Sequence, residues 1–537
     1  MATHPRLRSA RYQFKQLVTC WHAYCFVLGM STLSFFVSRQ VLFGLALLVF
    51  GTAVAQADGF GFAQVEARAR SLAHAPYDAT PPALPSFLKD LDPAQYAQIQ
   101  DIHPYWSDSD SPFQVQFYVP GSYFPRPEKI SVADQGAVAA IPFQLQDFSF
   151  GTLHPQDLPR DLGYAGFRLL YPLNTPPNDN EFISFLGATY FRAVGKDAIY
   201  GTSARGIGID TAQPSGEIFP YYRHIWLVKP APGATDMTVY ALMDSSVVTG
   251  AYRFIIHPGT DCVVDVQATI YLRKPVQVLE LAPLTSMFWH GHGRGVRAGD
   301  WHPAQHDSSE LVLANGNGEW ISRPLDNPLQ IQTTSYEMQQ PQGFGLIQQP
   351  RDFAAYQGIE TQYQRRPSVW VSPVGDWGKG QVRLVELPTN NPDMDNIDVF
   401  WVPATQPQPG TAYHYAYQVR FFNQQHGLIP LAHPTATYLG YDEKDPKWQH
   451  VVVDFSGGAL TRLPGTMTLQ AHFSAADGAQ VRDQHLEYSQ DGHFWRLLAE
   501  VQTAPNVPSN LRAFLTLNDQ VMTDTWTFLL QPTQGGH

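Results

Sequence analysis

The sequence predicts an all-β protein built from two β-sandwiches, and three observations support this fold class. Aromatic residues make up 13% of the 537 residues, and their rings pack well on the pleated surface of a sheet. Apolar residues alternate with polar or flexible ones in many short runs, for example at 113–119 and 413–421. The 41 glycines and 43 prolines separate these runs, and many short strands with frequent turns are typical of sandwiches and barrels.

Residues 1–57 have the pattern of a secretory signal. They contain five basic residues and no Asp or Glu, and a basic residue precedes a short apolar run at 41–50. Residues 55–57 (Ala-Gln-Ala) form a small-x-small cleavage site. A membrane span needs about 20 apolar residues, so we expect a cleaved Sec-type signal, with an uncleaved anchor as the alternative. Because residues 1–29 make this signal unusually long, we predict that Met30 is the true start.

The chain after the signal opens with two helical patterns and continues in strands. Apolar residues at three- and four-residue spacing predict a helix over 62–72, and a less regular pattern predicts another over 88–99. From Phe113 onward the spacing changes to the two-residue period of strands. Further strands are predicted at 237–243, 252–256, 262–272, 382–387, 397–402, 451–455 and 526–530.

The distribution of these runs predicts two domains. The segment 426–446 is rich in polar residues and prolines and predicts a linker. Residues 58–425 are too many for one small sandwich and predict an extended or doubled one. Residues 447–537 carry short strands over a length that suits an immunoglobulin-like sandwich, which takes about 100 residues.

Charge and cysteine content restrict the function. Without residues 1–57, 30 basic residues remain against 47 acidic ones, a formal charge of −17. This acidic body argues against nucleic acid and anionic membrane surfaces as partners. Of the three cysteines, Cys20 and Cys25 lie in the predicted signal, so the secreted chain keeps one thiol and no internal disulfide. That thiol, Cys262, lies in a strand-like run, and we expect it to be buried.

Six motifs distributed along the chain carry a family resemblance. They are FLGATYFRAVG at 185–195, YGTSARG at 200–206, GAYRF at 250–254, LTSMF at 284–288, RPSVW at 366–370 and GDWGKG at 375–380. Together they resemble the periplasmic glucan biosynthesis protein G/D family, and the similarity extends over the whole chain after the signal. A Sec-type rather than a twin-arginine signal favours the G type.

The resemblance implies a fold, a function and a location. The implied fold is a large galactose-mutarotase-like sandwich followed by an immunoglobulin-like domain. Members of the family take part in making osmoregulated periplasmic glucans with a β-1,2-linked glucose backbone, and they resemble inverting glycoside hydrolases or transglycosylases. The implied partners are this glucan and the inner-membrane glucan synthase machinery, and no cofactor is expected. A non-catalytic glucan-binding or scaffold protein of the same pathway is the alternative.

Asp395 is the candidate catalytic acid. Glycoside cleavage needs a protonated acid at the leaving oxygen and a base that activates water, and two carboxyl groups about 6.5–9.5 Å apart suit inversion. Asp395 follows the predicted strand 382–387 on a loop, where a carboxyl group can face a cleft. The resemblance implies the family's acid at this Asp-Asn-Ile position. An aspartate that caps a turn is the alternative, and Asp376 is a second candidate acid.

Asp307 is the candidate base, and Tyr363 is the candidate proton relay. The resemblance matches Asp307 to a family His-Asp position and implies that the base reaches the water indirectly, through intervening hydroxyl groups. Tyr363 is the best matched of these hydroxyls, and a phenol both donates and accepts a hydrogen bond. A solvated turn aspartate and a core tyrosine are the alternatives.

Two departures from the family pattern bear on the site. Family members often carry Glu three residues before the acid, whereas this chain has Pro392 there. Asp393 replaces that charge, or the site is weaker or differently tuned. The stretch after 288 also departs and contributes histidines at a spacing that can bind zinc or copper. It is loop-like and lacks matching cysteines, so we expect loop histidines and no metal. These residues are His290, His292, His302 and His306.

Further residues are candidates for sugar contacts, because a ring face packs well against the C–H face of a pyranose. Packing in the core or on the surface is the alternative for each of them. The glycines at 375–380 predict a turn rather than a phosphate-binding loop, because the strand-like run 382–387 follows at once. The candidates are Arg205, Trp301, Arg365, Trp370 and Trp377.

Overall fold

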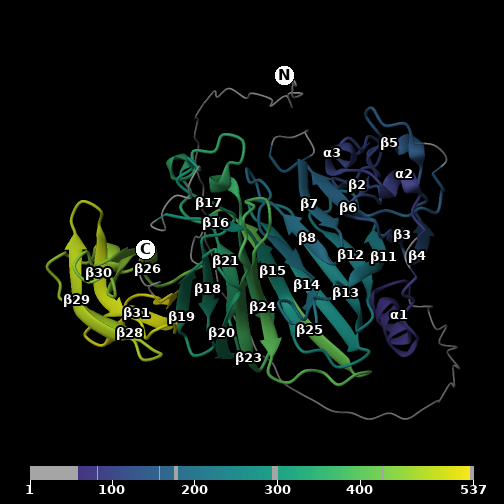
Figure 1. The fold of residues 1–537 in the computed structure, drawn as a ribbon. Coiled ribbons are helices and arrows are strands. Elements are labelled where there is room, and N and C mark those ends of the chain that lie inside the picture. Colours follow the sequence, from purple (N-terminus) through teal and green to yellow (C-terminus); the bar gives the residue numbers. More distant parts are fainter. Residues whose placement is uncertain are drawn as a thin grey trace, which may run out of the picture. The chain divides into compact units, whose positions relative to one another are not determined.

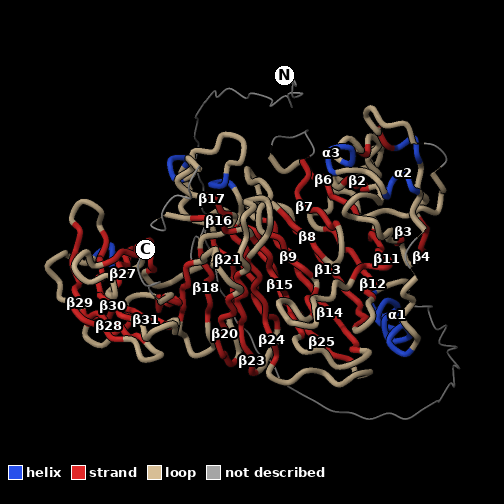
Figure 2. The backbone as a smooth tube through the Cα atoms, viewed as in Figure 1, coloured by secondary structure: helices blue, strands red, loops and turns tan. Residues whose placement is uncertain are grey.

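The computed structural model describes residues 59–80, 83–155, 158–174, 180–292, 300–424 and 428–532. The predictions for the signal peptide, Met30, Cys20 and Cys25 lie outside these residues. The described chain is nearly all β, and Figure 2 shows many strands beside a few short helices. The predicted all-β sandwich fold is therefore confirmed.

Two large sheets build the first sandwich (Figure 1). The first sheet has ten strands in the order β2-β6-β7-β8-β9-β15-β24-β23-β20, with β10 beside β15. Its strands are β2 (Gln114–Tyr118), β6 (Gly166–Tyr171), β7 (Asn180–Leu186), β8 (Tyr190–Ala193), β9 (Ser203–Arg205), β10 (Ile207–Ile209), β15 (Leu279–Ser286), β20 (Gln332–Gln339), β23 (Lys379–Glu386) and β24 (Ile397–Pro403).

The second sheet has fifteen strands in the order β28-β31-β33-β19-β18-β21-β22-β25-β14-β13-β12-β11-β3-β4, with β32 beside β31. Its strands are β3 (Lys129–Asp134), β4 (Ala137–Ala140), β11 (Tyr221–Val228), β12 (Met237–Asp244), β13 (Val248–His257), β14 (Cys262–Leu272), β18 (Glu310–Ala314), β19 (Trp320–Pro324), β21 (Gly343–Ile347), β22 (Ser368–Val374), β25 (Ala412–Phe422), β28 (Gln470–Ala475), β31 (Ser509–Leu517), β32 (Gln520–Val521) and β33 (Thr525–Leu530). All nine runs predicted as strands lie on strands of the structure.

Aromatic rings join the two sheets into one buried core. Phe185 of β7 packs edge-on against Phe254 of β13 with ring centroids 5.2 Å apart, and Phe191 of β8 packs against Phe421 of β25 at 6.3 Å. Because side chains alternate along a strand, the neighbours of the inward rings lie on the outer face of the ten-stranded sheet.

The helices lie near the start of the described chain. The predicted helix over 62–72 is confirmed as α1 (Phe62–His74), whose Val65 and Ala69 are fully buried against Trp226 and its neighbours on the fifteen-stranded sheet. The predicted helix over 88–99 is wrong as one element. It forms two single turns, α2 (Ser86–Lys89) and α3 (Pro93–Tyr96), because Asp92 caps a new helix that Pro93 begins. No helix among the described residues is long and apolar enough to span a membrane.

The C-terminal strands form a second, smaller sandwich. A four-stranded sheet in the order β26-β27-β30-β29 encloses a core with β28, β31 and β33. Its strands are β26 (His433–Tyr441), β27 (Gln449–Ser456), β29 (Gln480–Ser489) and β30 (Phe494–Gln502). Four and three main strands are the numbers expected of an immunoglobulin-like sandwich. β26 lies inside the predicted linker 426–446, so much of that segment is a strand, with a bulge between Pro434 and Ala436.

Two short pairings complete the sheets. β1 (Gln100–Asp101) pairs with β5 (Phe148–Ser149), and β16 (Phe288–His290) pairs with β17 (Gln305–His306). The second pair corrects the interpretation of the histidine stretch as loop alone. Cys262 begins β14 and is fully buried, as predicted.

Candidate functional site

Asp395 lies on the loop between β23 and β24, and Asn396 fixes this loop. The Asn396 side chain accepts a hydrogen bond from the Phe288 backbone N–H (2.8 Å) and donates one to the Leu387 carbonyl (3.1 Å). The backbone N–H of Asn396 donates to the Ser286 carbonyl (3.0 Å). Asn396 is 1% exposed. The loop lines a pocket of about 360 Å³ that includes Asp395.

The carboxyl group of Asp395 is open to solvent but lies in a concave part of the surface. Protein surrounds it at longer range, and this partial loss of bulk water is the largest cause that raises its pKa to about 6. The negative charge of Asp307 raises the pKa further, whereas Arg192 and Arg366 lower it. The carboxyl group therefore keeps its proton nearer to neutral pH than an ordinary aspartate, as a general acid requires.

Asp307 follows β17 and is 4% exposed. Its backbone N–H donates to the Met287 carbonyl (2.8 Å), which ties the residue to the end of β15. Its carboxylate accepts a hydrogen bond from the Arg366 guanidinium in a close ion pair. Burial raises the pKa of Asp307, and the charges of Arg366 and Arg192 oppose this rise. The two candidate carboxyl groups thus lie within each other's electric field and share the same arginines.

Tyr363 lies beside this ion pair. It begins a short 3-10 helix, Tyr363–Arg365, and its ring lies under the Arg366 guanidinium, 4.2 Å from ring centroid to Cζ. Burial raises the pKa of the phenol to about 12, and the charges of Asp307, Asp393 and Asp300 add to the rise. No hydrogen bond joins the Tyr363 hydroxyl to Asp307 within the part of the chain that the structure describes. The phenol is therefore close to the candidate base, but a relay would need a water between them.

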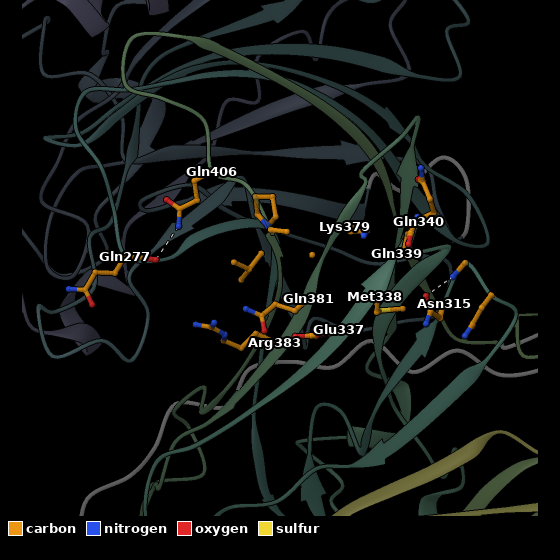
Figure 3. Close-up of a pocket in the computed structure, with 16 residues that line it drawn as sticks. Gln277, Asn315, Glu337, Met338, Gln339, Gln340, Lys379, Gln381, Arg383 and Gln406 are labelled. Carbon is orange, nitrogen blue, oxygen red and sulfur yellow. Dashed lines mark hydrogen bonds between the residues drawn. The ribbon is translucent and has the colours of Figure 1, made fainter.

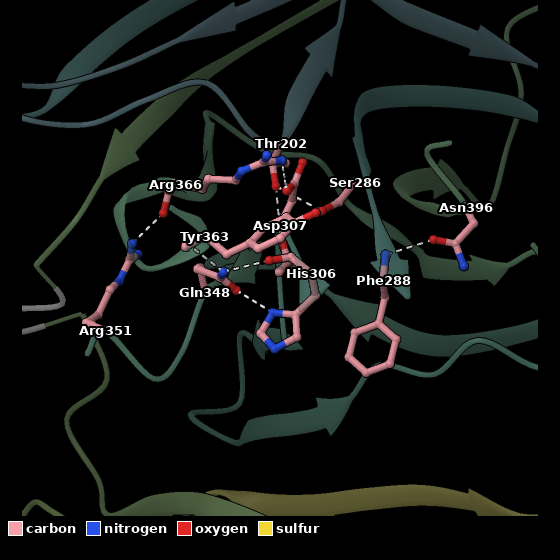
Figure 4. Close-up of polar contacts among 11 residues, drawn as sticks. Thr202, Ser286, Phe288, His306, Asp307, Gln348, Arg351, Tyr363, Arg366 and Asn396 are labelled. Atoms are coloured by element: carbon pink, nitrogen blue, oxygen red, sulfur yellow. Dashed lines mark hydrogen bonds and ion pairs between the residues drawn. The ribbon is translucent and has the colours of Figure 1, made fainter. Parts of the chain in front are cut away.

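Gln348 holds the segments that carry Asp307 and Tyr363 together (Figure 4). Its amide N–H₂ donates to the carbonyls of His306 (2.7 Å) and Tyr363 (2.9 Å), and its amide oxygen lies 2.7 Å from His306 Nδ1. Gln348 is fully buried. Arg351 adds a second tie, because its guanidinium donates to the Arg366 carbonyl and to Ser368 Oγ (2.8 Å).

Three hydroxyl groups form a closed, buried triangle next to Asp307 in the chain. Thr202 Oγ1 lies 3.0 Å from Ser286 Oγ and 2.8 Å from Ser308 Oγ, and Ser286 Oγ donates to Ser308 Oγ at 2.9 Å. All three residues are at most 1% exposed. Each hydroxyl finds its hydrogen-bond partner within the triangle. The triangle therefore connects the chain before β9, the end of β15 and the residue after Asp307 through uncharged groups.

Sequence reasoning missed Arg366 and selected its neighbour Arg365. Arg365 is exposed and donates to the Asp197 carbonyl (3.0 Å) and to Gln362 Oε1 (2.7 Å). The 3-10 turn directs Arg366, and not Arg365, toward Asp307. The Arg366 side chain packs over Gly201, where an added Cβ would lie 2.9 Å from the Arg366 Cβ. A glycine opposite an arginine pair was the available signal, but it does not say which arginine packs there.

Two predicted sugar contacts lie in the core. Trp370 is 5% exposed and stacks on Trp320 with ring centroids 5.8 Å apart. Trp377 is 8% exposed, donates to the Ala416 carbonyl (3.0 Å) and packs against Trp401. Neither ring face is available to a ligand in this structure, because each packs against other core side chains. Both residues therefore follow the core alternative, and the predicted sugar contacts at these positions are corrected.

Arg205 and Trp301 lie in contrasting surroundings. Trp301 is 66% exposed and stacks on His302 at 3.8 Å, so its outer face is open to a ligand. Arg205 is 1% exposed, forms an ion pair with Glu217 (2.7 Å) and lies between the rings of Tyr190 and Phe219. The charge of Arg205 also acts on Asp398, whose pKa burial raises to about 6. Since Asp395 and Asp398 influence each other, this cluster borders the candidate site.

Asp376 lies at the other end of β23 from the β23–β24 loop. Its carboxylate accepts a hydrogen bond from the Gly378 N–H (2.7 Å) in a turn where Gly375 and Gly378 have φ of 83° and 68°. The predicted turn is confirmed. β23 spans eight residues, roughly 25 Å, so Asp376 is too distant to act together with Asp395.

Among the residues that the structure describes, these four histidines form no group with the spacing of metal ligands. His290 and His302 both contact Asp300, with Nε2–Oδ2 3.1 Å and Nδ1–Oδ1 2.8 Å. Partial burial raises the pKa of Asp300, but hydrogen bonds from these histidines and the His302 backbone lower it to about 2. His306 is turned to Gln348, and burial lowers its pKa to about 3. His292 is exposed.

Among the described residues, a different group has the spacing of metal ligands. Oxygen and nitrogen atoms of Asp442, His450 and Glu500 lie within 4.8 Å of one another. Arg482 donates to Asp442 (2.8 Å) and to Glu500 (2.5 Å). The arginine already balances these carboxylates, so this group carries no argument for a metal.

A comparison with known protein families assigns the chain to a family. The family model described as periplasmic glucan biosynthesis protein, MdoG, matches residues 60–530. The match covers nearly all of the described chain, including both sandwiches and the Asp395–Asp307 site. The family acts in glucan biosynthesis in the periplasm, and the predicted periplasmic location follows from it. The chain belongs to the periplasmic glucan biosynthesis protein family, MdoG.

Proposed function

We propose that this protein acts on the β-1,2-linked glucose backbone of a periplasmic glucan, as an inverting glycoside hydrolase or transglycosylase. It belongs to the G type of the family, reaches the periplasm through a cleaved Sec-type signal, and works beside the inner-membrane glucan synthase machinery. Family membership supports the glucan and the compartment. The β-1,2 linkage, the type and the reaction are parts of the proposal.

One observation carries the proposal: a solvent-accessible carboxyl group whose pKa is raised to about 6 lies within the field of a second, buried carboxyl group. Two carboxyl groups with different surroundings are the usual requirement of glycoside cleavage. Asp395 has the properties of the acid, because it reaches solvent and holds its proton near neutral pH. Asp307 has the properties of the base, because Arg366 and Arg192 favour its carboxylate.

The proposed reaction assigns one proton transfer to each group. Asp395 donates its proton to the glycosidic oxygen as the bond to the anomeric carbon breaks. A water, or a sugar hydroxyl in transglycosylation, attacks that carbon from the opposite side and loses its proton toward Asp307. Tyr363 passes this proton, since its hydroxyl both donates and accepts. A second water between the phenol and Asp307 carries the proton over the last step, because the phenol makes no direct hydrogen bond to Asp307.

The second candidate function is a non-catalytic glucan-binding or scaffold protein. The observation that favours it is the close ion pair between Asp307 and Arg366. An aspartate held by an arginine is a weaker base than a free one. Pro392, which stands where family members often carry a glutamate, also favours a protein without catalytic activity. The exposed ring of Trp301 would serve binding as well as catalysis.

Incubation with linear β-1,2-glucan tests the two candidates. We expect shorter or rearranged glucans from the natural protein and a loss of turnover of at least about 100-fold in Asp395→Asn, in the range of general acid catalysis. The variant should still bind glucan, since the amide has the same shape as the carboxyl group. Equal product formation by Asp395→Asn would reject the assigned acid. Glucan binding without any product from the natural protein would support the scaffold.

A further inference from the structure

A large pocket lies at the end of the ten-stranded sheet opposite to Asp395. It has a volume of about 1000 Å³ and is formed by the ends of β20, β23 and β24 with the loops around them (Figure 3). Asp395 lies where β23 ends and β24 begins, whereas this pocket lies where β23 begins and β24 ends. The seven residues of β24 separate the two places by roughly 20 Å.

Carboxamide side chains dominate the lining of this pocket. Gln339 and Gln381 lie on neighbouring strands, and the other amides come from the surrounding loops. A carboxamide offers two donors and one acceptor with two lone pairs, which matches a sugar hydroxyl that both donates and accepts. The amides are Gln277, Asn315, Asn317, Gln339, Gln340, Gln381 and Gln406.

The pocket has a rigid floor and a fixed wall. Gly380 lies against Trp401, and a Cβ there would be 2.4 Å from that ring and from the Val402 carbonyl oxygen. On the wall, the Gln406 side chain donates to the Gln277 carbonyl (3.0 Å), and the Gln277 side chain donates to Ser215 Oγ (3.1 Å). A preformed site loses less entropy on binding a chain ligand than a flexible one.

Polar groups in the pocket remain available to a ligand. The side chains of Gln339 and Gln381 make no hydrogen bond to another described residue, and Lys379 and Arg383 form no ion pair there. Arg383 Nε is buried without a partner. Glu337 balances one of the two positive charges, so the pocket is close to neutral. Such a mixture of donors and acceptors suits an uncharged, hydroxyl-rich ligand better than an apolar peptide.

The pocket is not an extension of the site at Asp395. Between them, Val385 and Phe400 on the same face of the sheet are buried with Val278. The loop that carries Thr211 and Ala212 lies over this strip, and Glu280 fixes it by accepting hydrogen bonds from the Thr211 N–H (2.7 Å) and hydroxyl (2.9 Å). A ligand in the pocket therefore cannot reach Asp395 through the sheet face and must cross the outside of this loop.

We propose that this amide-rich pocket is a second binding site for an uncharged oligosaccharide, which holds a distant part of the same glucan chain that Asp395 acts on. The inference rests on the proposed function for the identity of the sugar, but the pocket would bind sugar whether or not Asp395 turns it over. Occupation of two linked sites makes the second binding event intramolecular and raises the affinity for long chains. Short chains reach only one site at a time.

Calorimetric titration of Asp395→Asn with linear β-1,2-gluco-oligosaccharides tests this inference without turnover. Short oligosaccharides should bind with two molecules per protein, and Gln339→Ala with Gln381→Ala should reduce this number to one. The same double change should weaken the binding of long glucan at least about tenfold. It should leave the cleavage of short oligosaccharides by the otherwise natural protein unchanged. One bound molecule in both proteins, or unchanged affinity for long glucan, would overturn the inference.

A matched control uses exposed glutamines outside the pocket. Gln408→Ala with Gln520→Ala removes the same groups and should change neither stoichiometry nor affinity. The two proposals fail in different ways. If the natural protein forms no product but the pocket variant still loses one bound sugar, the proposed enzyme fails and the second site stands. If product forms but the pocket variant binds normally, the second site fails alone.

Discussion

At the scale of single residues, one arginine influences both candidate carboxyl groups. Arg366 contacts Asp307 directly, and its charge lowers the pKa of both Asp307 and Asp395. Burial acts in the opposite direction on both groups. The balance between burial and this guanidinium therefore sets the pH range in which the base is ionised while the acid is protonated.

Replacement of Arg366 by alanine should move the pH profile of turnover to higher pH. Without the guanidinium the pKa of Asp307 rises, so the acidic limb moves up, and the pKa of Asp395 rises, so the alkaline limb moves up as well. A nearby opposite charge typically shifts a carboxyl pKa by about 1–3 units, and we expect a displacement of about one unit. Initial rates on β-1,2-glucan between pH 4 and 9 give the measurement.

Arg366→Lys is the matched control for this displacement. It keeps the positive charge, so its profile should lie closer to that of the natural protein, although the planar guanidinium is lost. Leaving Asp307 buried without its partner costs about 3–5 kcal/mol, so thermal unfolding must show that Arg366→Ala is folded at the assay temperature. A folded alanine variant with an unmoved profile would show that Asp307 is not the titrating base.

At the scale of elements, Gln348 connects β21 with the two segments that carry the candidate base and relay. Its side chain bonds to the backbone of His306 and Tyr363 and to the His306 ring. These partners are buried and have no access to water. The Gln348 amide therefore helps to fix the position of Tyr363 relative to Asp307, together with the ties made by Arg351 and Arg366.

Gln348→Leu should destabilise the protein by about 2 kcal/mol, because it leaves buried carbonyl groups without a donor. Urea unfolding followed by tryptophan fluorescence measures this loss. We also expect a lower turnover number with little change in KM, since the change displaces the relay rather than the sugar-binding surface. Glu360→Ala, an exposed change on the loop before Tyr363, should alter neither quantity. Full stability of Gln348→Leu would show that the tie is dispensable.

At the scale of the whole molecule, a buried acidic pair lies where the second sandwich joins the first. β19 pairs in parallel with β33, with Ser322 opposite Trp526. Ser322 Oγ donates to Asp524 Oδ2 (3.0 Å), and Asp524 is fully buried. Burial raises the pKa of Asp524 to about 7. Burial, together with the charge of Asp524, raises the pKa of Glu310 to about 8.

This pair should make the protein less stable as the pH rises from about 4 to about 8. Both folded pKa values lie above the ordinary values of about 4, so the folded protein binds more protons than the unfolded chain in this window. The free energy of unfolding then falls with increasing pH. Asp524→Asn removes one of these protons and keeps an acceptor for Ser322. Melting temperatures between pH 5 and 8 should therefore fall less steeply in this variant.

Asp491→Asn is the control for the junction. Asp491 is exposed in a turn of the second sandwich, and its replacement should leave the pH dependence of the melting temperature as it is in the natural protein. If Asp524→Asn gives the same pH dependence as the natural protein, the buried pair is ionised in the folded state. The proton on Asp524 would then not contribute to the stability of the folded protein.

The secondary structure of this protein follows largely from its sequence. Strands such as β14 and β25 are long alternations of buried and half-buried residues, and a period of two can be read without knowing the partner strand. The helix α1 is defined by its own apolar spacing in the same way. The sequence took β26 for part of a linker, because its prolines and polar neighbours are typical of loops. Local patterns determine local structure.

The assignment of side chains to core or cleft required the tertiary structure. The residues next to Trp370 and Trp377 in the sequence do not show whether these rings are buried or exposed. The strands that bury them come from distant parts of the chain. The motifs indicated Asp395 and Asp307, yet the choice of Arg366 over Arg365 depends on one 3-10 turn. The pKa of Asp395 and the pocket opposite to it arise from burial and from charges brought together by folding. These are properties of three-dimensional proximity, which the order of residues along the chain does not contain.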